Sequence, residues 1–522
     1  MKKHLAFVLL SFLSGHLKAQ YNPDWVVPAA EYQKTGVMMA CDTGNNLIIT
    51  GYRPSYLGAA HIYTRKFDET GNLLWERTDS SGVPQKYQRP AWVNVDAQNN
   101  IYVCGYRYAG TGTISSDTIL AIKYDPNGTL LWKKNLADLH LGPLPMRSEL
   151  DAAGNFYIAT INPAGPGFYL VKFDPNGNVL FTVSNSSTGN ISMNSMRIRN
   201  DKIVLGSYAS LGSIACVAVF DTSGNFLWGN NYPTWGVSDL EIDSAENIYF
   251  ISRKENQVAA SSGFDISLYK LNPNGSVAAI THYDFGNSTD APARMTLVNG
   301  KISVTGWTVQ AGSPYMNWVT FQSDLNGNLL WQAIYNQTSS NDEIPYWISA
   351  KPGGEVFVSG KGGPDTIGFN GSVYLRYVTL KYINGQVQWV DADPYQGYTG
   401  IANCIAGDGS LYVLGEYAMT AIHYVDNGAS TGLDPYAPVP TAILYPNPTT
   451  GHLRIAFESE RASEARLTLF DGRGRVMRTI YPLEIRTGKN EVSLDLTTAE
   501  PGLYTGILES PVQRLRFKII RQ

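Results

Sequence analysis

The nine residues Phe67–Trp75 read FDETGNLLW, and the phrase returns as YDPNGTLLW at Tyr124–Trp132 and as FDTSGNFLW at Phe220–Trp228. Weaker copies begin at Phe173, at Leu271 and around Gln322, and a shortened one spans Tyr382–Trp389. The turn glycine of the phrase recurs roughly every 50 residues, a period typical of propeller blades or solenoid units. The chain is therefore expected to consist of structural repeats.

A second phrase alternates with the first. Its clearest copy is DAQNNIYVCG at Asp96–Gly105. Further copies span Asp42–Gly51, Asp151–Thr160, Asp243–Ser252, Gly354–Gly360 and Gly409–Gly415, with reduced forms at Asn200–Gly206 and Asn299–Gly306. One copy of each phrase makes a unit of four strands of about five residues, with alternating or short apolar patterns. Eight copies predict eight such units.

The turn residues are typical of hairpins. In Asp125-Pro126-Asn127-Gly128, the Asp side chain is expected to cap the turn, Pro to fix φ, and Gly to adopt a positive φ. A calcium loop needs acids at alternate positions and a distal Glu, so these turns are not predicted to bind calcium. The Trp that ends a unit is expected to fill the space between neighbouring sheets rather than to bind a ligand. These residues are Trp75, Trp132, Trp228, Trp331 and Trp389.

The last unit indicates how the ring closes. It lacks a final Trp strand, and a strand of that type, Asp24–Val27, stands alone before the first unit. We expect this strand to complete the last blade, which leaves no open sheet edge. Cys41 and Cys404 would then lie on adjacent inner strands, where a disulfide could join them. Cys104 and Cys216 fall in apolar strands and are expected to be buried free thiols.

The predicted fold is all-β, with an eight-bladed β-propeller over residues 20–427 and a small Ig-like β-sandwich over residues 441–522. Seven blades are the alternative, because the fourth and sixth units are degenerate. Residues 428–440, GASTGLDPYAPVP, are predicted to be a linker. Residues 1–19 carry a basic start and an apolar run and are predicted to be a secretory signal peptide. No later apolar run is long enough for a membrane span, so a secreted protein is expected.

The tail carries a distinctive set of motifs. They are Tyr445-Pro446-Asn447-Pro448, Asp471-x-x-Gly474-x-Val476, Pro501-Gly502-Leu503-Tyr504 and a basic end that contains Lys518. As a set they resemble the type A C-terminal sorting domain of the type IX secretion system of Bacteroidetes. The resemblance implies that the type IX machinery is a partner, and that the tail is removed during passage across the outer membrane. It also implies release of the protein or its attachment at the cell surface.

No pattern in the sequence indicates a catalytic, cofactor-binding or metal-binding residue. The histidines form no HxH or HExxH pair, and GxSxG, a P-loop and CxxC are absent. The repeats resemble the bacterial β-propeller repeat class, which implies a fold without assigning a site. The formal net charge is −4 and both ends are basic, so the body between them is acidic. An acidic body disfavours nucleic acid as a partner.

Two functions fit these observations. The favoured hypothesis is a non-catalytic surface propeller that binds a glycan or protein through the Gly-, Ser-, Thr- and Tyr-rich loops Tyr52–Ala60, Arg107–Asp117 and Gly360–Gly371. The alternative is a secreted polysaccharide hydrolase or lyase with acids at the mouth of a central channel. Convergence of Asp, Glu, Arg or His there would favour the enzyme, whereas Gly, Ser and aliphatic residues would favour binding.

Overall fold

The computed structural model places most of the chain. It describes residues 21–27, 34–53, 60–80, 86–109, 118–136, 146–161, 167–185, 190–209, 214–255, 263–286, 289–310, 315–336, 342–367, 373–391, 399–416, 419–426, 443–459, 462–470, 476–509 and 514–522. The predicted signal peptide and linker lie outside the described residues. The chain divides into two compact units, residues 1–427 and 428–522. The described residues contain strands and turns but no helix.

The described part of the first unit forms eight four-stranded antiparallel sheets. The first four are β2 (Thr35–Cys41), β3 (Leu47–Tyr52), β4 (Ile62–Phe67) and β5 (Leu73–Asp79); β6 (Lys86–Val95), β7 (Ile101–Ala109), β8 (Thr118–Tyr124) and β9 (Leu130–Leu136); β10 (Arg147–Leu150), β11 (Phe156–Ile161), β12 (Phe168–Phe173) and β13 (Val179–Asn185); and β14 (Asn190–Arg199), β15 (Lys202–Ala209), β16 (Ala215–Asp221) and β17 (Phe226–Tyr232). In each sheet the four strands pair in chain order.

The next three sheets repeat this order, and the fourth strand of the last sheet comes from the N-terminal part of the chain. They are β18 (Trp235–Ile242), β19 (Ile248–Glu255), β20 (Phe264–Leu271) and β21 (Val277–Tyr283); β22 (Thr289–Val298), β23 (Lys301–Val309), β24 (Met316–Asp324) and β25 (Leu329–Tyr335); β26 (Ile344–Ala350), β27 (Glu355–Ile367), β28 (Val373–Ile383) and β29 (Gln386–Asp391); and β30 (Gly400–Ile405), β31 (Leu411–Gly415), β32 (Ala421–Asp426) and β1 (Tyr21–Val27). The sheets are numbered one to eight below in this order.

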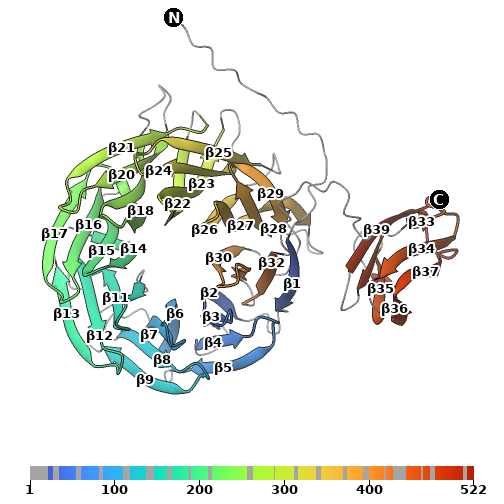
Figure 1. Ribbon diagram of the computed structural model, residues 1–522, viewed down its shortest axis with the longest axis horizontal. Helices are drawn as coiled ribbons and strands as arrows, with labels where there is room; N and C mark the ends of the chain where they lie inside the picture. The colour runs from blue at the N-terminus through green and yellow to red at the C-terminus, as the bar shows by residue number, and fades with distance from the viewer. Residues whose placement is uncertain are drawn as a thin grey trace, which may run out of the picture. The chain divides into compact units, whose positions relative to one another are not determined.

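The sheets form a closed ring, a β-propeller (Figure 1). The first strand of each sheet faces the centre, and each of these inner strands contacts the inner strands of the two neighbouring sheets, including β30 with β2. The apolar core lies between the sheets, where side chains of adjacent sheets are buried against each other. Among the described elements the inner strands meet around the centre, so they determine which described residues gather there.

The ring closes as predicted. Strand β1 pairs with β32 as the fourth strand of the last sheet, with Trp25 opposite His423. A disulfide joins Cys41 on β2 to Cys404 on β30, so the first and last sheets are also linked covalently. Cys104 and Cys216 are buried free thiols, as expected.

The repeated Trp and Gly form one contact. Trp75 of the first sheet lies on the turn between β8 and β9, where its Nε1 donates to the Pro126 carbonyl oxygen at 3.0 Å. A Cβ atom on Gly128 would lie 2.7 Å from the Trp75 ring, so the ring requires a glycine there. Trp25, Trp132 and Trp228 make the same contacts with the next sheet. The Trp side chains therefore fill the space between sheets, as predicted.

The Asp turns have the predicted chemistry. Oδ1 of Asp125 accepts hydrogen bonds from the backbone N–H groups of Asn127 and Thr129, at 2.9 and 2.7 Å. Gly128 has φ +79°. The same pattern recurs at Asp68, Asp96, Asp151, Asp174, Asp221, Asp243 and Asp324. Because the backbone already occupies this oxygen, these aspartates act as turn residues.

The predicted strand length of about five residues is wrong for many strands. Strand β6 spans ten residues from Lys86, and β27 extends over 13 residues. Pro90 marks the predicted start of β6, but the pairing continues past it through a bulge between Pro90 and Trp92. Inner strands without proline have the same bulge, as between Gly36 and Met38 on β2, and a bulge accommodates a residue without an N–H group, so Pro90 does not end the strand.

The second unit contains two sheets around its own core. They are β33 (Ile443–Tyr445), β34 (His452–Ser459) and β37 (Gly488–Asp495), and β36 (Val476–Ile485), β35 (Ser463–Phe470), β38 (Gly502–Glu509) and β39 (Arg514–Arg521). Leu453, Leu467, Leu494 and Leu508 are among the buried residues of this core. The Asp471–Gly474 part of the tail motif lies outside the described residues.

Candidate functional site at the centre of the ring

The inner strands carry residues that do not repeat. One residue of each of six inner strands occupies an equivalent place, opposite the fourth residue of the apolar segment near the start of the second strand of its sheet. These residues are Trp92, Arg147, Ser195, Asp239, Arg294 and Trp347. Two residues further along their strands stand Glu149, Arg197 and Glu241. We call the first set the ladder level and the second set the acid level. Charged and aromatic side chains from six sheets therefore gather around the centre.

The ladder level contains two neighbouring aromatic rings, each with a cation stacked on it. The rings of Trp92 and Trp347, from sheets two and seven, lie 5.8 Å apart. The Arg147 guanidinium lies over Trp92 at 4.8 Å, and that of Arg294 lies over Trp347 at 5.0 Å. Such stacking fixes the plane of each guanidinium and reduces its hydration. Four sheets thus contribute to one cross-centre stack.

Neither guanidinium forms an ion pair with a described carboxylate, although the charge of Asp239 acts on both and favours their charged forms. Among the described residues, no carboxylate oxygen lies within 4.0 Å of Arg147 or Arg294. Arg147 donates one hydrogen bond, from Nη1 to the Met146 carbonyl oxygen at 3.0 Å. Burial, and next the charge of Arg294, lowers the pKa of Arg147 to about 9. An anion bound between the two arginines would relieve this repulsion.

The acid level surrounds a third arginine. Arg197 lies 3.0 Å from Glu241, 3.7 Å from Glu149 and 3.6 Å from Asp239 of the ladder level. Asp239 also accepts a hydrogen bond from Ser195 Oγ at 2.7 Å. Each acid is therefore held by the same cation, an arrangement that orders the centre.

The acids have perturbed titration. Burial raises the pKa of Glu149 to about 7, although Arg197 opposes the shift. Burial also raises the pKa of Glu241. Burial alone would lower the pKa of Arg197, but the three carboxylates raise it overall. The side chains of Arg197 and Glu149 are 26% and 27% exposed, so solvent reaches the acid level.

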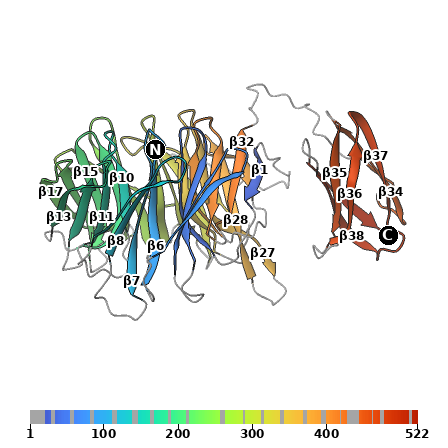
Figure 2. The same cartoon turned by 90° about the horizontal axis from the view of Figure 1, so that it is seen from below.

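The ladder level lies nearer the variable loops. In each sheet the loop that enters the inner strand and the loop that leaves the second strand lie at one end, because these strands are antiparallel. The arrowheads of β7 and β27 point to this same end in Figure 2. Ladder residues precede acid residues along the inner strands, so a ligand arriving from the loop end meets the ladder first. The predicted binding loops Tyr52–Ala60 and Arg107–Asp117 lie mostly outside the described residues. The prediction of a loop over Gly360–Gly371 is wrong for residues 360–367, because they extend strand β27, which pairs with β28.

The sequence analysis missed every residue of this site, because no motif contains them. A signal existed, however. When the units are aligned on the Asp of the second phrase, Arg147 and Asp239 occupy the place held by Met38 in the first unit. Glu149 and Glu241 likewise occupy the place of Ala40. Charge at a position that elsewhere holds small or apolar residues indicates a role outside the repeat.

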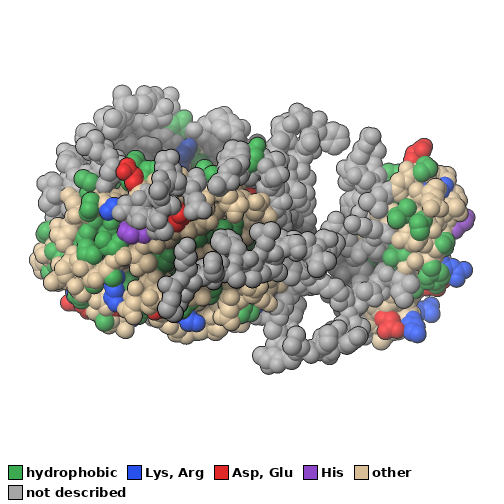
Figure 3. Space-filling model, turned by 90° about the horizontal axis from the view of Figure 1, so that it is seen from above, with side chains coloured by type: hydrophobic (Ala, Val, Ile, Leu, Met, Phe, Trp, Pro, Cys, Tyr) green, Lys and Arg blue, Asp and Glu red, His purple; other side chains and the backbone are tan. Residues whose placement is uncertain are grey.

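On the side of the first unit seen in Figure 3, the described Lys, Arg, Asp and Glu side chains are scattered singly among apolar and uncharged ones. No described helix is long and apolar enough to cross a membrane.

Comparison with known proteins places the second unit in a family. Residues 443–522 match the family described as "Secretion system C-terminal sorting domain". This match confirms the resemblance to the type IX sorting domain and indicates export to the cell surface or the extracellular space. Nothing among curated proteins matches the chain.

Solved structures similar to the chain include propellers with low sequence identity. One is the Dos1 propeller, with 12% identity, a TM-score of 0.48, and coverage of 79% of this chain and 97% of that one. Another is a protein of unknown function from Bacteroides caccae, with 11% identity, a TM-score of 0.32 and coverage of 58% and 94%. A third is described as an ulvan lyase of polysaccharide lyase family PL25, with 9% identity, a TM-score of 0.39 and coverage of 69% and 97%.

Proposed function

We propose that this exported propeller binds an acidic glycan at the ladder level of its ring centre. The observation that carries the proposal is the pair of arginines, Arg147 and Arg294, each stacked on a tryptophan and without a carboxylate partner among the described residues. Guanidinium groups bind carboxylates and sulfates in bidentate geometry. The exported location fits an extracellular polymer as the ligand.

The ladder suits binding better than cleavage. Its arginines lie nearer the loops, whereas Glu149 and Glu241 lie deeper and are both engaged by Arg197. A ligand carboxylate or sulfate placed between Arg147 and Arg294 would lie where their charges now repel each other. The loop residues would then contact the rest of the glycan, as adaptable polar groups do at other binding surfaces.

Binding can be tested on the chain from residue 20 onward. We expect polymers with carboxylate or sulfate groups, but not neutral ones, to bind with an affinity that falls as salt rises. Arg147→Ala and Arg294→Ala should each weaken binding at least about tenfold. Arg466→Ala is the matched control, because Arg466 also stacks on an aromatic ring, Tyr481, but in the second unit. Binding that survives both ladder variants, or a protein as the only ligand, would overturn the proposal.

A second function, glycan cleavage, is favoured by one observation. Acids and arginines converge at the centre, where a purely binding propeller is expected to present Gly, Ser and aliphatic residues. Glu149, with its pKa near 7, is suited to proton transfer at neutral pH. New reducing ends or unsaturated products from a bound polymer, lost in Glu149→Gln while binding persists, would establish this function. Binding without any product would exclude it for that polymer.

We further propose that each of the eight sheets is one blade and that residues 441–522 fold as an Ig-like sandwich. The formation of sheets four and six, from the degenerate units, supports eight blades over seven. The domains would be a signal peptide over 1–19, the propeller over 20–427, a linker over 428–440 and the sorting domain over 441–522. The intact mass of the exported protein tests the two cleavages, because it should lack both ends.

A further inference from the structure

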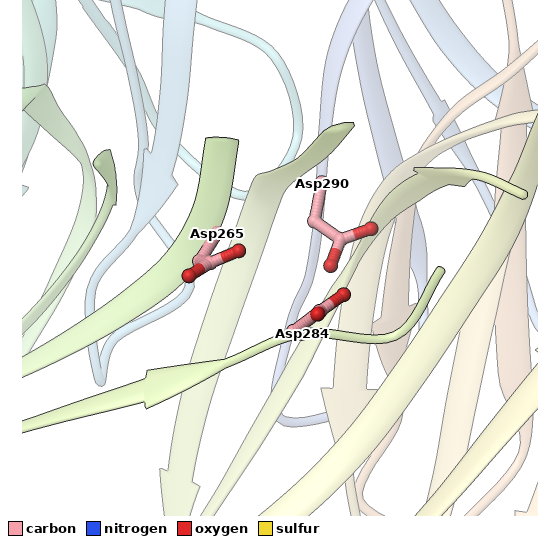
Figure 4. Close-up of side chains that lie close together, drawn as sticks. All are labelled: Asp265, Asp284 and Asp290. Atoms are coloured by element: carbon pink, nitrogen blue, oxygen red, sulfur yellow. The ribbon is translucent and has the colours of Figure 1, made fainter. Parts of the chain in front are cut away.

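Three carboxylates converge between sheets five and six. Asp265 lies on β20, Asp284 follows β21, and Asp290 lies on β22 (Figure 4). One oxygen from each side chain lies within 4.8 Å of the others, and the carboxyl groups point towards a common space. Asp265 and Asp290 are fully buried. Carboxylates so close together repel one another, and a cation among them offsets that repulsion.

The hydrogen bonds at Asp290 leave one oxygen unused. Its Oδ2 accepts from the backbone N–H of Phe285 at 2.7 Å. Its Oδ1 is buried and accepts no hydrogen bond from the described residues, which also provide it with no ion-pair partner. This pattern differs from that of the turn aspartates, whose oxygens are occupied by backbone N–H groups. A buried carboxylate oxygen without a partner indicates a missing ligand.

A second polar atom beside the cluster is also unsatisfied. Thr308 lies opposite Asp290 on β23, and its buried Oγ1 is close enough to the Asp290 carboxyl group to oppose the rise of its pKa, but no hydrogen bond of good geometry joins them. A Cβ atom on Gly286 would lie 2.6 Å from this hydroxyl, so the backbone approaches it closely. The Gly286 N–H in turn donates to Asp284 Oδ1 at 3.2 Å. The hydroxyl, the glycine and the three acids therefore enclose one small space.

We propose that Asp265, Asp284 and Asp290 bind a hard divalent cation, of the class of Ca²⁺ and Mg²⁺. Such ions take oxygen ligands, and carboxylates are their preferred side-chain donors. The Thr308 hydroxyl is placed to complete the oxygen shell directly or through water. The ion would connect sheet five to sheet six at the loop end of the ring. This inference is independent of the proposed glycan site, although Arg294 lies on the same strand as Asp290.

The experiment uses the chain from residue 20 onward, stripped with EDTA and titrated with Ca²⁺ or Mg²⁺ by calorimetry and in thermal melts. The wild type should bind one ion at this site and melt at a higher temperature with it. Asp290→Asn should lose that ion and the temperature rise. In EDTA it should melt no lower than the wild type, because one of three mutually repelling charges is gone. A purely structural role for Asp290 would instead lower the melting temperature under both conditions.

The matched control is Asp201→Asn, an exposed turn acid that should leave binding and the temperature rise unchanged. Should Asp290→Asn fail to fold, Asp284→Asn provides the same comparison at a partly exposed position. The proposal is overturned if the wild type binds neither ion at millimolar concentration. It is equally overturned if the folded variants bind the same number of ions as the wild type.

Discussion

At the scale of single residues, one contact explains why the repeat contains both a turn glycine and a final tryptophan. The turn glycine and the final tryptophan were predicted to have separate roles, one in closing a hairpin and one in filling space. In the structure Trp75 packs on Gly128 of the next sheet, so each residue requires the other. The sequence predicted the residue types correctly but not their pairing, because partners on adjacent sheets are about 50 residues apart.

We expect Gly128→Ala to destabilise the ring by about 2 to 4 kcal/mol, because the new methyl group meets the Trp75 ring and the φ of +79° is strained. Gly354→Ala is the control, since Gly354 has φ +98° but no atom within 4 Å of an added Cβ. It should show only the backbone penalty, about 1 to 2 kcal/mol. Urea denaturation measures both. Equal losses would show that the indole contact has no energetic role.

The raised pKa of Glu149 predicts that the stability of the folded protein depends on pH. Its folded-state pKa of about 7 lies above the ordinary value of 4.5, so the folded state binds this proton more tightly. Its contribution to stability is fully present below pH 4.5 and is lost as pH rises through 7. The stability of the wild type relative to Glu149→Gln should therefore fall over this range, by at most about 3 kcal/mol. If the stability difference between the wild type and Glu149→Gln, taken from melting curves, is the same at pH 4.5 and at pH 8, the raised pKa of Glu149 is contradicted.

At the scale of strands, local pattern determined which elements form but not where they end. The closing strand was predicted from an unpaired Trp segment, and β1 does complete the last sheet. The inner strands proved longer than predicted, because pairing across a bulge continues beyond Pro90, which alone looks like a boundary. Turn residues are local signals, whereas strand ends depend on the neighbouring strand.

Strand β1 and the disulfide close the same junction, and this overlap can be measured. Trp25→Ala should cost about 3 kcal/mol with the disulfide intact and more in reductant, where the junction has lost its covalent link and depends on non-covalent contacts such as those of β1. Trp228→Ala removes the same type of contact from an interior junction. Its cost should therefore be equal under both conditions, as followed by urea denaturation. If Trp25→Ala were also indifferent to reductant, the two closures would be independent.

At the scale of the whole molecule, the ring could be predicted from the repeats, but its centre could not. Trp92 and Trp347 belong to sheets two and seven and become neighbours only when the ring closes. Arg147 and Arg294 likewise face each other from sheets three and six. No local pattern encodes such proximity, so the sequence analysis predicted no site residue. The three acids of the proposed cation site were not predicted either, because they come from separate segments of two sheets.

We expect the first unit to bind its ligand without the second unit, and the second unit to be needed for export. Because each has its own core, deletion of residues 443–522 should leave the ring folded, with the same melting temperature and glycan affinity as the full chain. In a bacterium with the type IX machinery, the deletion should stop export and retain the protein inside the cell envelope. Cell fractionation with a tagged chain measures this. Normal export of the shortened chain would assign the signal to another segment.

The junction that recurs between sheets has an evolutionary consequence. Since the same indole-on-glycine contact joins sheet eight to sheet one, one to two, two to three and four to five, duplication of one such unit supplies both halves of a new junction at once. Ring size can therefore change by copying a gene segment, without inventing an interface. The innermost strands take no part in that contact, which leaves them free to diversify while the scaffold is inherited unchanged.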